Sequence, residues 1–337
     1  MKNKLIATIF IMFIATGTLF ATESSTVFGA AGAYYFDDNK GYNLNNGDFA
    51  PVTYTKIPAP PDDTKRALGS GWGGAEAKAS ITHKIKVPFM QGTGTLTADN
   101  NILYQFKGEL SPVSINTIAS ATLTPIAFLN FQAGTQLGTG WNFFGIFNGL
   151  GLNSDGNPLE TNIPGIVSKS WLSGTFQFDI GALVPGEWTH VIMAATAKGE
   201  YKHFSAAQVG DAWQYEADAG ENFNGFSFLG TYFLGYQLPY KFNTVGFLVE
   251  TEQMLGSNTE LSTEDPINWG SDFTQVTFGP LANIQLTEDS SLVILVQFRK
   301  EKLFSTDTID ENYFRNREYT GSYIDFRRIA FSYSMKL

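Results

Sequence analysis

The last eleven residues, RRIAFSYSMKL (327–337), alternate apolar and polar side chains up to the final residue. The apolar positions are Ile329, Phe331, Tyr333, Met335 and Leu337. Successive side chains of a β-strand point to opposite faces, so this spacing predicts a strand with one apolar face. Chain ends usually fray unless they are tied down. An alternation that persists to the last residue therefore predicts that the C-terminus is paired within a sheet.

The same period of two recurs along the whole chain, in segments that are long for strands. The expected strands are 25–36, 48–56, 75–88, 99–110, 113–134, 172–183, 189–203, 226–238, 242–253, 273–286, 291–304 and the terminal segment. Strands of soluble proteins usually have about 5–6 residues. A tilted strand that crosses a membrane needs about 9–11 residues, and extensions lengthen it further. The lengths favour membrane-spanning strands.

The connections between these segments alternate between short and long. Short turns are expected at Ser111–Pro112, 185–187, Pro239–Tyr240 and 287–290, and longer polar stretches at 135–168, 205–225, 254–272 and 304–321. Short turns on one side and long loops on the other are typical of a transmembrane β-barrel. The sequence therefore predicts an all-β, closed antiparallel transmembrane barrel. Twelve strands are the expected number, with ten or fourteen as alternatives.

The N-terminus and the composition narrow the function classes. Lys2 and Lys4 precede an apolar run, which predicts a signal peptide over 1–21 and a single barrel domain over 22–337. Removal of the signal peptide takes away two lysines and no acidic residues, which changes the formal net charge from −10 to −12. Such acidity argues against nucleic acid as a partner. The chain has no cysteine, which excludes disulfides and thiolate metal sites.

The terminal strand resembles that of bacterial outer-membrane β-barrel proteins of the porin-like class. Tyr333 matches the upstream aromatic residue of that class, whereas Leu337 departs from its usual terminal Phe or Trp. The resemblance implies insertion into the outer membrane of a diderm bacterium, with short turns and the C-terminus in the periplasm. It also implies that the assembly machinery reads the terminal strand through Phe331, Tyr333, Met335 and Leu337. The resemblance indicates no subfamily.

In such a barrel the polar face of each strand lines the lumen. By this alternation, the charged residues expected there are Lys78, Lys84, Lys86, Lys107, Glu109, Asp179, Lys198, Glu200, Glu250, Arg299, Glu301 and Arg328. The long loops are predicted to form an acidic extracellular mouth, with Asp211, Glu216, Asp218, Glu221, Glu260, Glu264, Asp265, Asp272, Asp307, Asp310 and Glu311. The Gly-rich stretch 138–153 is a candidate constriction loop, through Trp141, Phe143 and Phe144.

These features favour a porin-like channel for small polar or charged solutes. No cofactor and no catalysis are expected, and the expected partners are the lipid bilayer, the assembly machinery and the solutes; the oligomeric state stays open. The main alternative is a surface barrel whose acidic loops bind a partner without significant conductance. A hydrophobic-solute transporter is a lesser alternative, and so is an outer-membrane phospholipase built on His203 and Ser205.

Overall fold

The computed structural model describes residues 23–35, 74–143, 147–152, 165–208, 213–216, 222–255, 273–304 and 319–337. Several predicted features lie outside these residues: the signal peptide, the strand over 48–56, Phe144, and every residue assigned to the acidic mouth except Glu216. Among the described residues, no helix has the length and apolar character needed to cross a membrane.

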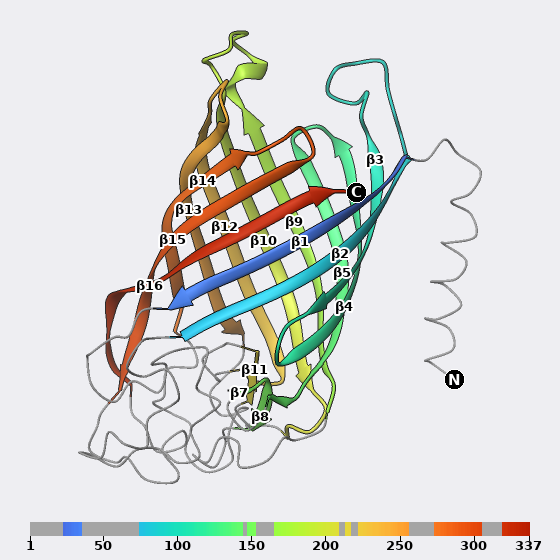
Figure 1. Cartoon of the computed structure of the whole chain (residues 1–337). Coiled ribbons are helices and arrows are strands. Elements are labelled where there is room, and N and C mark those ends of the chain that lie inside the picture. The colour runs from blue at the N-terminus through green and yellow to red at the C-terminus, as the bar shows by residue number, and fades with distance from the viewer. Residues whose placement is uncertain are drawn as a thin grey trace, which may run out of the picture.

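The described residues form a closed antiparallel barrel of twelve strands (Figure 1). These are β1 (Glu23–Tyr35), β2 (Gly74–Pro88), β3 (Asn101–Leu110), β4 (Ser114–Ile126), β5 (Leu129–Gly140), β9 (Val167–Asp179), β10 (Val191–Phe204), β12 (Gly225–Gln237), β13 (Phe242–Leu255), β14 (Gln275–Gln285), β15 (Ser290–Phe304) and β16 (Tyr319–Lys336). The predicted fold class and strand number are confirmed.

The barrel closes where the terminal strand meets the first strand. β16 pairs with β1 from Val27↔Lys336 to Tyr35↔Arg328, and it pairs with β15 on its other edge. The expected pairing of the last strand with the first is therefore confirmed. From Arg328 to Lys336 both edges of β16 are paired, so this part of the seam has no free strand edge.

The two ends of the barrel differ. At one end, here named the turn end, lie the C-terminus and the connections 89–100, 127–128, 180–190, 238–241 and 286–289. The 3-10 helix η4 (Ile180–Ala182) belongs to one of these connections. At the opposite end, named the loop end, lie the connection 111–113, the described parts of 141–166 and 205–224, and the strand ends Tyr35, Gly74, Leu255, Gln275, Phe304 and Tyr319. The amide of Lys336 donates to the carbonyl of Asp289 at 2.8 Å, which fixes the C-terminus at the turn end.

The segment 113–134, predicted as one strand, is two strands joined by a tight turn at Ala127–Phe128. Pairing lapses between Leu123↔Phe131 and Ile126↔Leu129. Pro125 lies in this lapse and has no N–H to donate to a ladder. The segment also exceeds the length that one membrane crossing requires. No Gly, Asn or Asp marks the turn, so the apolar run concealed a reversal of the chain.

This extra reversal corrects the predicted direction of the preceding strands. The Ser111–Pro112 turn lies at the loop end, not with the other short turns, and the connection near 89–98 lies at the turn end. Strands β2 and β3 therefore run opposite to their predicted directions. β1 pairs directly with β2, so the barrel reaches twelve strands without 48–56. The missed turn adds one strand to the predicted count, and the direct pairing of β1 with β2 removes one. The predicted number of twelve is therefore unchanged.

The two faces of the wall have opposite character. The exposed apolar side chains of the strands fall on one parity, and they include Ile81, Phe131, Leu172, Phe176, Met193, Tyr232, Leu234, Phe247 and Phe331. Charged and amide side chains occupy the other parity and contact one another across strands. Side chains converge only on the concave face of a closed sheet, so the polar set faces the interior and the apolar set covers the outside.

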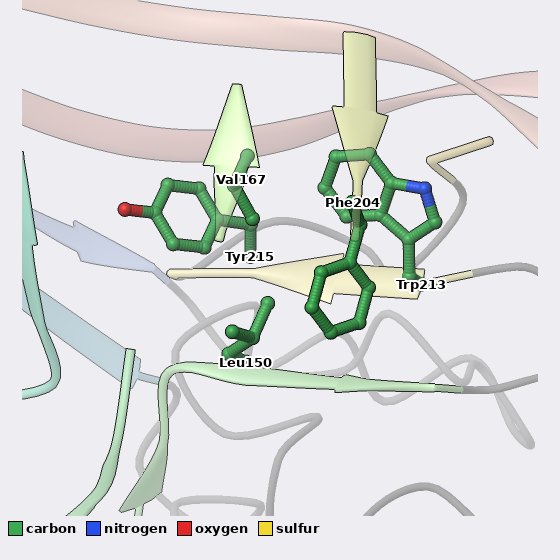
Figure 2. Close-up of a cluster of buried hydrophobic side chains, with 5 residues drawn as sticks. All are labelled: Leu150, Val167, Phe204, Trp213 and Tyr215. Carbon is green, nitrogen blue, oxygen red and sulfur yellow. The ribbon is translucent and has the colours of Figure 1, made fainter. Parts of the chain in front are cut away.

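At the loop end, short segments fold together into a small hydrophobic core. β8 (Leu150–Leu152) pairs with β11 (Trp213–Tyr215), and β6 (Asn142–Phe143) pairs with β7 (Phe147–Asn148). Leu150, Val167, Phe204 and Trp213 are fully buried there, and the ring centroids of Phe204 and Trp213 lie 5.8 Å apart. Figure 2 shows the Tyr215 hydroxyl directed away from Phe204 and Trp213. This core holds β11 against the mouth of the barrel.

Candidate functional site: the barrel interior and its plug

Ion pairs line the half of the interior that lies nearer the loop end. Lys107 binds Glu109 at 2.5 Å, and Lys198 binds Glu200 at 2.7 Å. Each pair joins residues two apart on one strand, which therefore share a face. The Lys198 ammonium also lies 5.7 Å from the centroid of the Trp171 ring. Lys202 of β10 binds Glu252 of β13, with β12 between them.

A second network spans four strands. Arg328 of β16 donates to Glu76 of β2 at 2.9 Å and also to Gln297 of β15. Gln297 in turn donates to Glu250 of β13 at 2.9 Å. Arg328 and Glu76 reach each other across β1, and Gln297 and Glu250 reach each other across β14. Contacts between strands that are not neighbours require the concave face, so this network lies inside the barrel.

Two interior lysine side chains are more exposed to solvent than the carboxylates that they bind. The Lys107 side chain is 35% exposed against 11% for Glu109, and Lys198 is 29% exposed against 6% for Glu200. The Lys202–Glu252 pair has the reverse arrangement, with 11% and 40%. Solvent therefore reaches charged groups of both signs inside the barrel. In the Lys107–Glu109 and Lys198–Glu200 pairs, the ammonium group is the more exposed partner.

The other charged residues predicted for the lumen lie at varied places. Lys86 pairs with Asp99 at 2.6 Å at the turn end, and Asp179 binds His190 at 2.7 Å beside η4. The register places Lys84 opposite Gln105 and Ser25, on the same face as Lys86. Arg299 is buried at 7% exposure on β15. Glu301 belongs to β15, and its side chain lies outside the described part of the structure.

Glu216, which the sequence assigned to the acidic outer mouth, turns into the barrel instead. One carboxylate oxygen accepts from Lys78 Nζ at 2.7 Å. The other accepts from Ser114 Oγ at 2.8 Å and from Asn116 Nδ2 at 2.7 Å. The segments 149–152 and 213–216 that carry and hold this residue are named the plug. The hydrophobic core around these segments positions Glu216 next to Lys78. No local sequence pattern indicates this position.

Two further observations describe how Glu216 is held. Its backbone has φ of 58°, in the left-handed region that non-glycine residues rarely adopt. Its amide donates to the carbonyl of Gly149 at 2.8 Å. Burial raises the pKa of the Glu216 carboxyl, but attraction to Lys78 and the hydrogen bonds from Lys78, Ser114 and Asn116 outweigh burial. The net pKa is therefore below the ordinary glutamate value, and the group is a carboxylate at neutral pH.

The candidate constriction residues are only partly described. Trp141 is half-buried and donates from its indole nitrogen to the carbonyl of Pro112 at 2.8 Å, which ties it to the β3–β4 turn. Phe143 belongs to β6 and its side chain lies outside the described residues, as does the whole of Phe144. The inward-pointing side chain that the described plug contributes is Glu216, from a different loop.

Part of the interior is apolar, which the sequence reasoning did not single out. Phe233, Leu248, Leu281 and Leu295 lie on β12 to β15, and their register places them on the polar parity of their strands. Phe233 faces Leu248, and Leu281 faces Leu295, in neighbouring strands. The interior therefore combines an apolar patch with the charged half described above.

Aromatic residues gather at the turn end. Trp188 and Tyr240 make an edge contact with ring centroids 5.6 Å apart, and both side chains are exposed. Tyr236 donates from its hydroxyl to the carbonyl of Trp188 at 2.6 Å. Amphipathic rings at the rim of a barrel are typical of the membrane–water interface.

The residues weighed for phospholipase chemistry make structural contacts. The Ser205 hydroxyl accepts from the amide of Ile166 at 2.9 Å. The Asn224 side chain donates to the carbonyls of Phe204 and Ala207 and accepts from the Phe204 amide at 2.7 Å. These bonds join the ends of β9, β10 and β12. Within the described ranges, no cluster of three or more His, Asp or Glu residues is arranged to hold a metal ion.

Comparisons with known proteins find no matching family model and no matching curated protein. Solved structures with a similar fold include the NanC porin, at 7% identity and a TM-score of 0.38 over 92% of this chain and 100% of that chain. The β-domain of the Bordetella autotransporter BrkA has 8% identity and a TM-score of 0.42, over 94% and 100% of the two chains. LpxR from Salmonella typhimurium has 10% identity and a TM-score of 0.38, over 92% and 99%. We draw no functional conclusion from likenesses this distant.

The fold class follows from the barrel itself. Twelve paired strands close without a free edge, the outside is apolar, the inside carries the charges, and aromatic rings stand at one rim. In lipid every backbone polar group must find a partner within the protein, and a closed barrel meets that condition. The chain is thus a closed β-barrel of the membrane-spanning type.

Proposed function

We propose that this protein is a porin-like channel for small polar or charged solutes in the outer membrane of a diderm bacterium, reached by export with the signal peptide 1–21. The observation that carries the proposal is the solvent exposure of interior cations. Lys107 and Lys198 retain 35% and 29% exposure inside the barrel. Water that reaches these groups indicates an interior that side chains do not fill.

The chemistry of such a channel would be set by its lining. The Lys107 and Lys198 side chains are more exposed than their carboxylate partners, which favours contact between a passing anion and these two lysines. Acidic loops at the mouth would instead enrich cations outside the barrel. No covalent step is needed for permeation, so the proposal includes no enzymatic activity.

The test is conductance of the refolded mature chain in planar bilayers. The wild type is expected to give stepwise openings, and Lys107→Gln is expected to shift the reversal potential toward cation preference, because Glu109 then loses its neighbouring charge. Glu187→Gln, in an exposed turn at the turn end, is the matched control and should leave the reversal potential unchanged. Absence of openings from correctly folded protein would overturn the proposal and favour the partner-binding alternative.

A further inference from the structure

We infer that Lys78, Ser114 and Asn116 form a carboxylate-binding site in the barrel wall, which Glu216 of the plug occupies as a tethered substitute for a solute carboxylate. A free small carboxylate would compete with Glu216 for this site. The inference rests on the proposed channel function and names a solute class for it.

The site provides three donors for two oxygens. Lys78 Nζ lies 2.7 Å from one Glu216 oxygen, while Ser114 Oγ and Asn116 Nδ2 lie 2.8 and 2.7 Å from the other. One ammonium group matches the single charge of a carboxylate. Hydrogen bonds to an ionised acceptor are roughly twice as strong as bonds between neutral groups. The geometry and the charge therefore fit a monocarboxylate.

The wall holds these donors in place through further contacts. Asn116 Oδ1 accepts from Gln136 of β5 at 2.7 Å and from the Tyr215 hydroxyl at 2.7 Å, so the amide nitrogen is directed at Glu216. Ser114 is 0% exposed and Asn116 is 2% exposed. The contact with Gln136 comes from the barrel wall and does not involve the plug. The three donors thus belong to the wall strands β2 and β4.

The occupant, in contrast, comes from outside the barrel wall. Glu216 follows β11. Its backbone has φ of 58°, a left-handed conformation that residues with a side chain disfavour. Besides Glu216, Lys78 is attracted to Glu109, at 4.0 Å, and to Glu76. A tethered group competes with an effective concentration on the order of millimolar. A free carboxylate is therefore expected to displace Glu216 in the millimolar range.

The test measures binding of sodium acetate to the refolded full-length mature protein in detergent, with sodium chloride at equal ionic strength and acetamide as the uncharged analogue. Line broadening of labelled acetate in NMR gives the affinity. Glu216→Ala is expected to bind acetate, and the wild type at least about tenfold more weakly. Lys78→Met in the Glu216→Ala background is expected to abolish binding, and acetamide should not bind.

Glu187→Gln is the control, because it removes a carboxylate at the turn end of the barrel, opposite the end that holds Lys78 and Glu216. It should bind acetate as weakly as the wild type. Glu216→Gln keeps the shape of the occupant without its charge and should give an intermediate affinity, so the inference stays testable if the alanine variant fails to fold. Equal acetate binding by wild type and folded Glu216 variants, or binding that survives loss of Lys78, would refute the site.

This readout separates the inference from the proposed function. Acetate binding does not depend on ion flux, so a protein that binds acetate in the predicted order but gives no openings would overturn the channel and retain the carboxylate site. If the protein conducts, acetate in the millimolar range should reduce the current through Glu216→Ala more than through the wild type. Conduction without any acetate effect on either protein would overturn the site and retain the channel.

Discussion

The backbone amide of Leu337 donates a hydrogen bond to the carbonyl of Thr26, with 2.9 Å between nitrogen and oxygen. The last residue of the chain thus pairs with the first strand. β16 pairs with β15 over most of its length and with β1 from Arg328 to Lys336. A missing bond within the membrane-spanning part of this seam exposes backbone polar groups to lipid, where they have no other partner.

Truncation of this seam should prevent barrel closure. Deletion of 331–337 removes the partners of Val27 to Gly32 in β1, so we expect no heat-modifiable band on gels. Deletion of Leu337 alone removes one bond and should have a small effect. Leu337→Phe introduces the terminal residue that is usual in the outer-membrane barrels that this strand resembles. This variant should assemble at least as well as the wild type. Full heat-modifiability after removal of 331–337 would contradict the role given to β16.

The apolar face should tolerate charge much less well than the interior. Leu172 is 71% exposed on the outer face near the middle of β9, and Ser120 lies on the inner face of β4 between Gln105 and Gly134. Leu172→Arg should lower the free energy of unfolding from lipid vesicles by about 2–4 kcal/mol. Ser120→Arg should cost much less, because its charge meets water. Urea titrations followed by tryptophan fluorescence measure both, and equal losses would refute the assignment of the faces.

Gly138 provides a way to displace the plug without touching Glu216. A Cβ at this position would lie 2.1 Å from both Asn116 Oδ1 and the Tyr215 hydroxyl oxygen. Gly138→Ala should therefore push Tyr215 away at a cost of about 1–3 kcal/mol, with the barrel intact. Exposure of the buried Trp213 should shift tryptophan emission to longer wavelength. Gly108→Ala is the control, since a Cβ there meets nothing within 4 Å, and it should leave the emission unchanged.

Acid should release the plug through Glu216. Because the pKa of Glu216 is lowered in the folded state, its charge stabilises the plug at pH values above its ordinary value of 4.5. That stabilisation is lost as the pH falls through the lowered pKa. Plug stability, followed by tryptophan emission from about pH 7 to about pH 3, should therefore fall more in the wild type than in Glu216→Gln. Parallel curves for the two proteins across this range would contradict the assignment, since other carboxylates titrate in both.

The sequence by itself determined the class of fold and the two faces of the wall. Period-two alternation fixes which side chains share a face, whatever direction the strand runs. For this reason the grouping of Lys107 and Glu109 on one face does not depend on the direction of β3, which was mispredicted. The alternation in RRIAFSYSMKL likewise sufficed to predict a paired C-terminus.

The positions of the turns between strands were harder to predict from the sequence. Ala127–Phe128 carries no residue that turns require, and only Pro125 and the length of 113–134 signal the break. The Ser111–Pro112 turn has a clear sequence signal, but its end of the barrel depends on the number of reversals that follow it. One missed turn therefore inverted the predicted directions of β2 and β3.

Only the tertiary structure decided where Glu216 goes. In the sequence it is one of many acidic residues in a long loop, and its partner Lys78 lies 138 residues away. The burial of Leu150, Phe204 and Trp213 brings β11 to the barrel mouth, and the donors of Ser114 and Asn116 then compensate the burial of its carboxylate. Alternation is a local property that sequence encodes directly, whereas this contact depends on packing between segments that meet only after the barrel has closed.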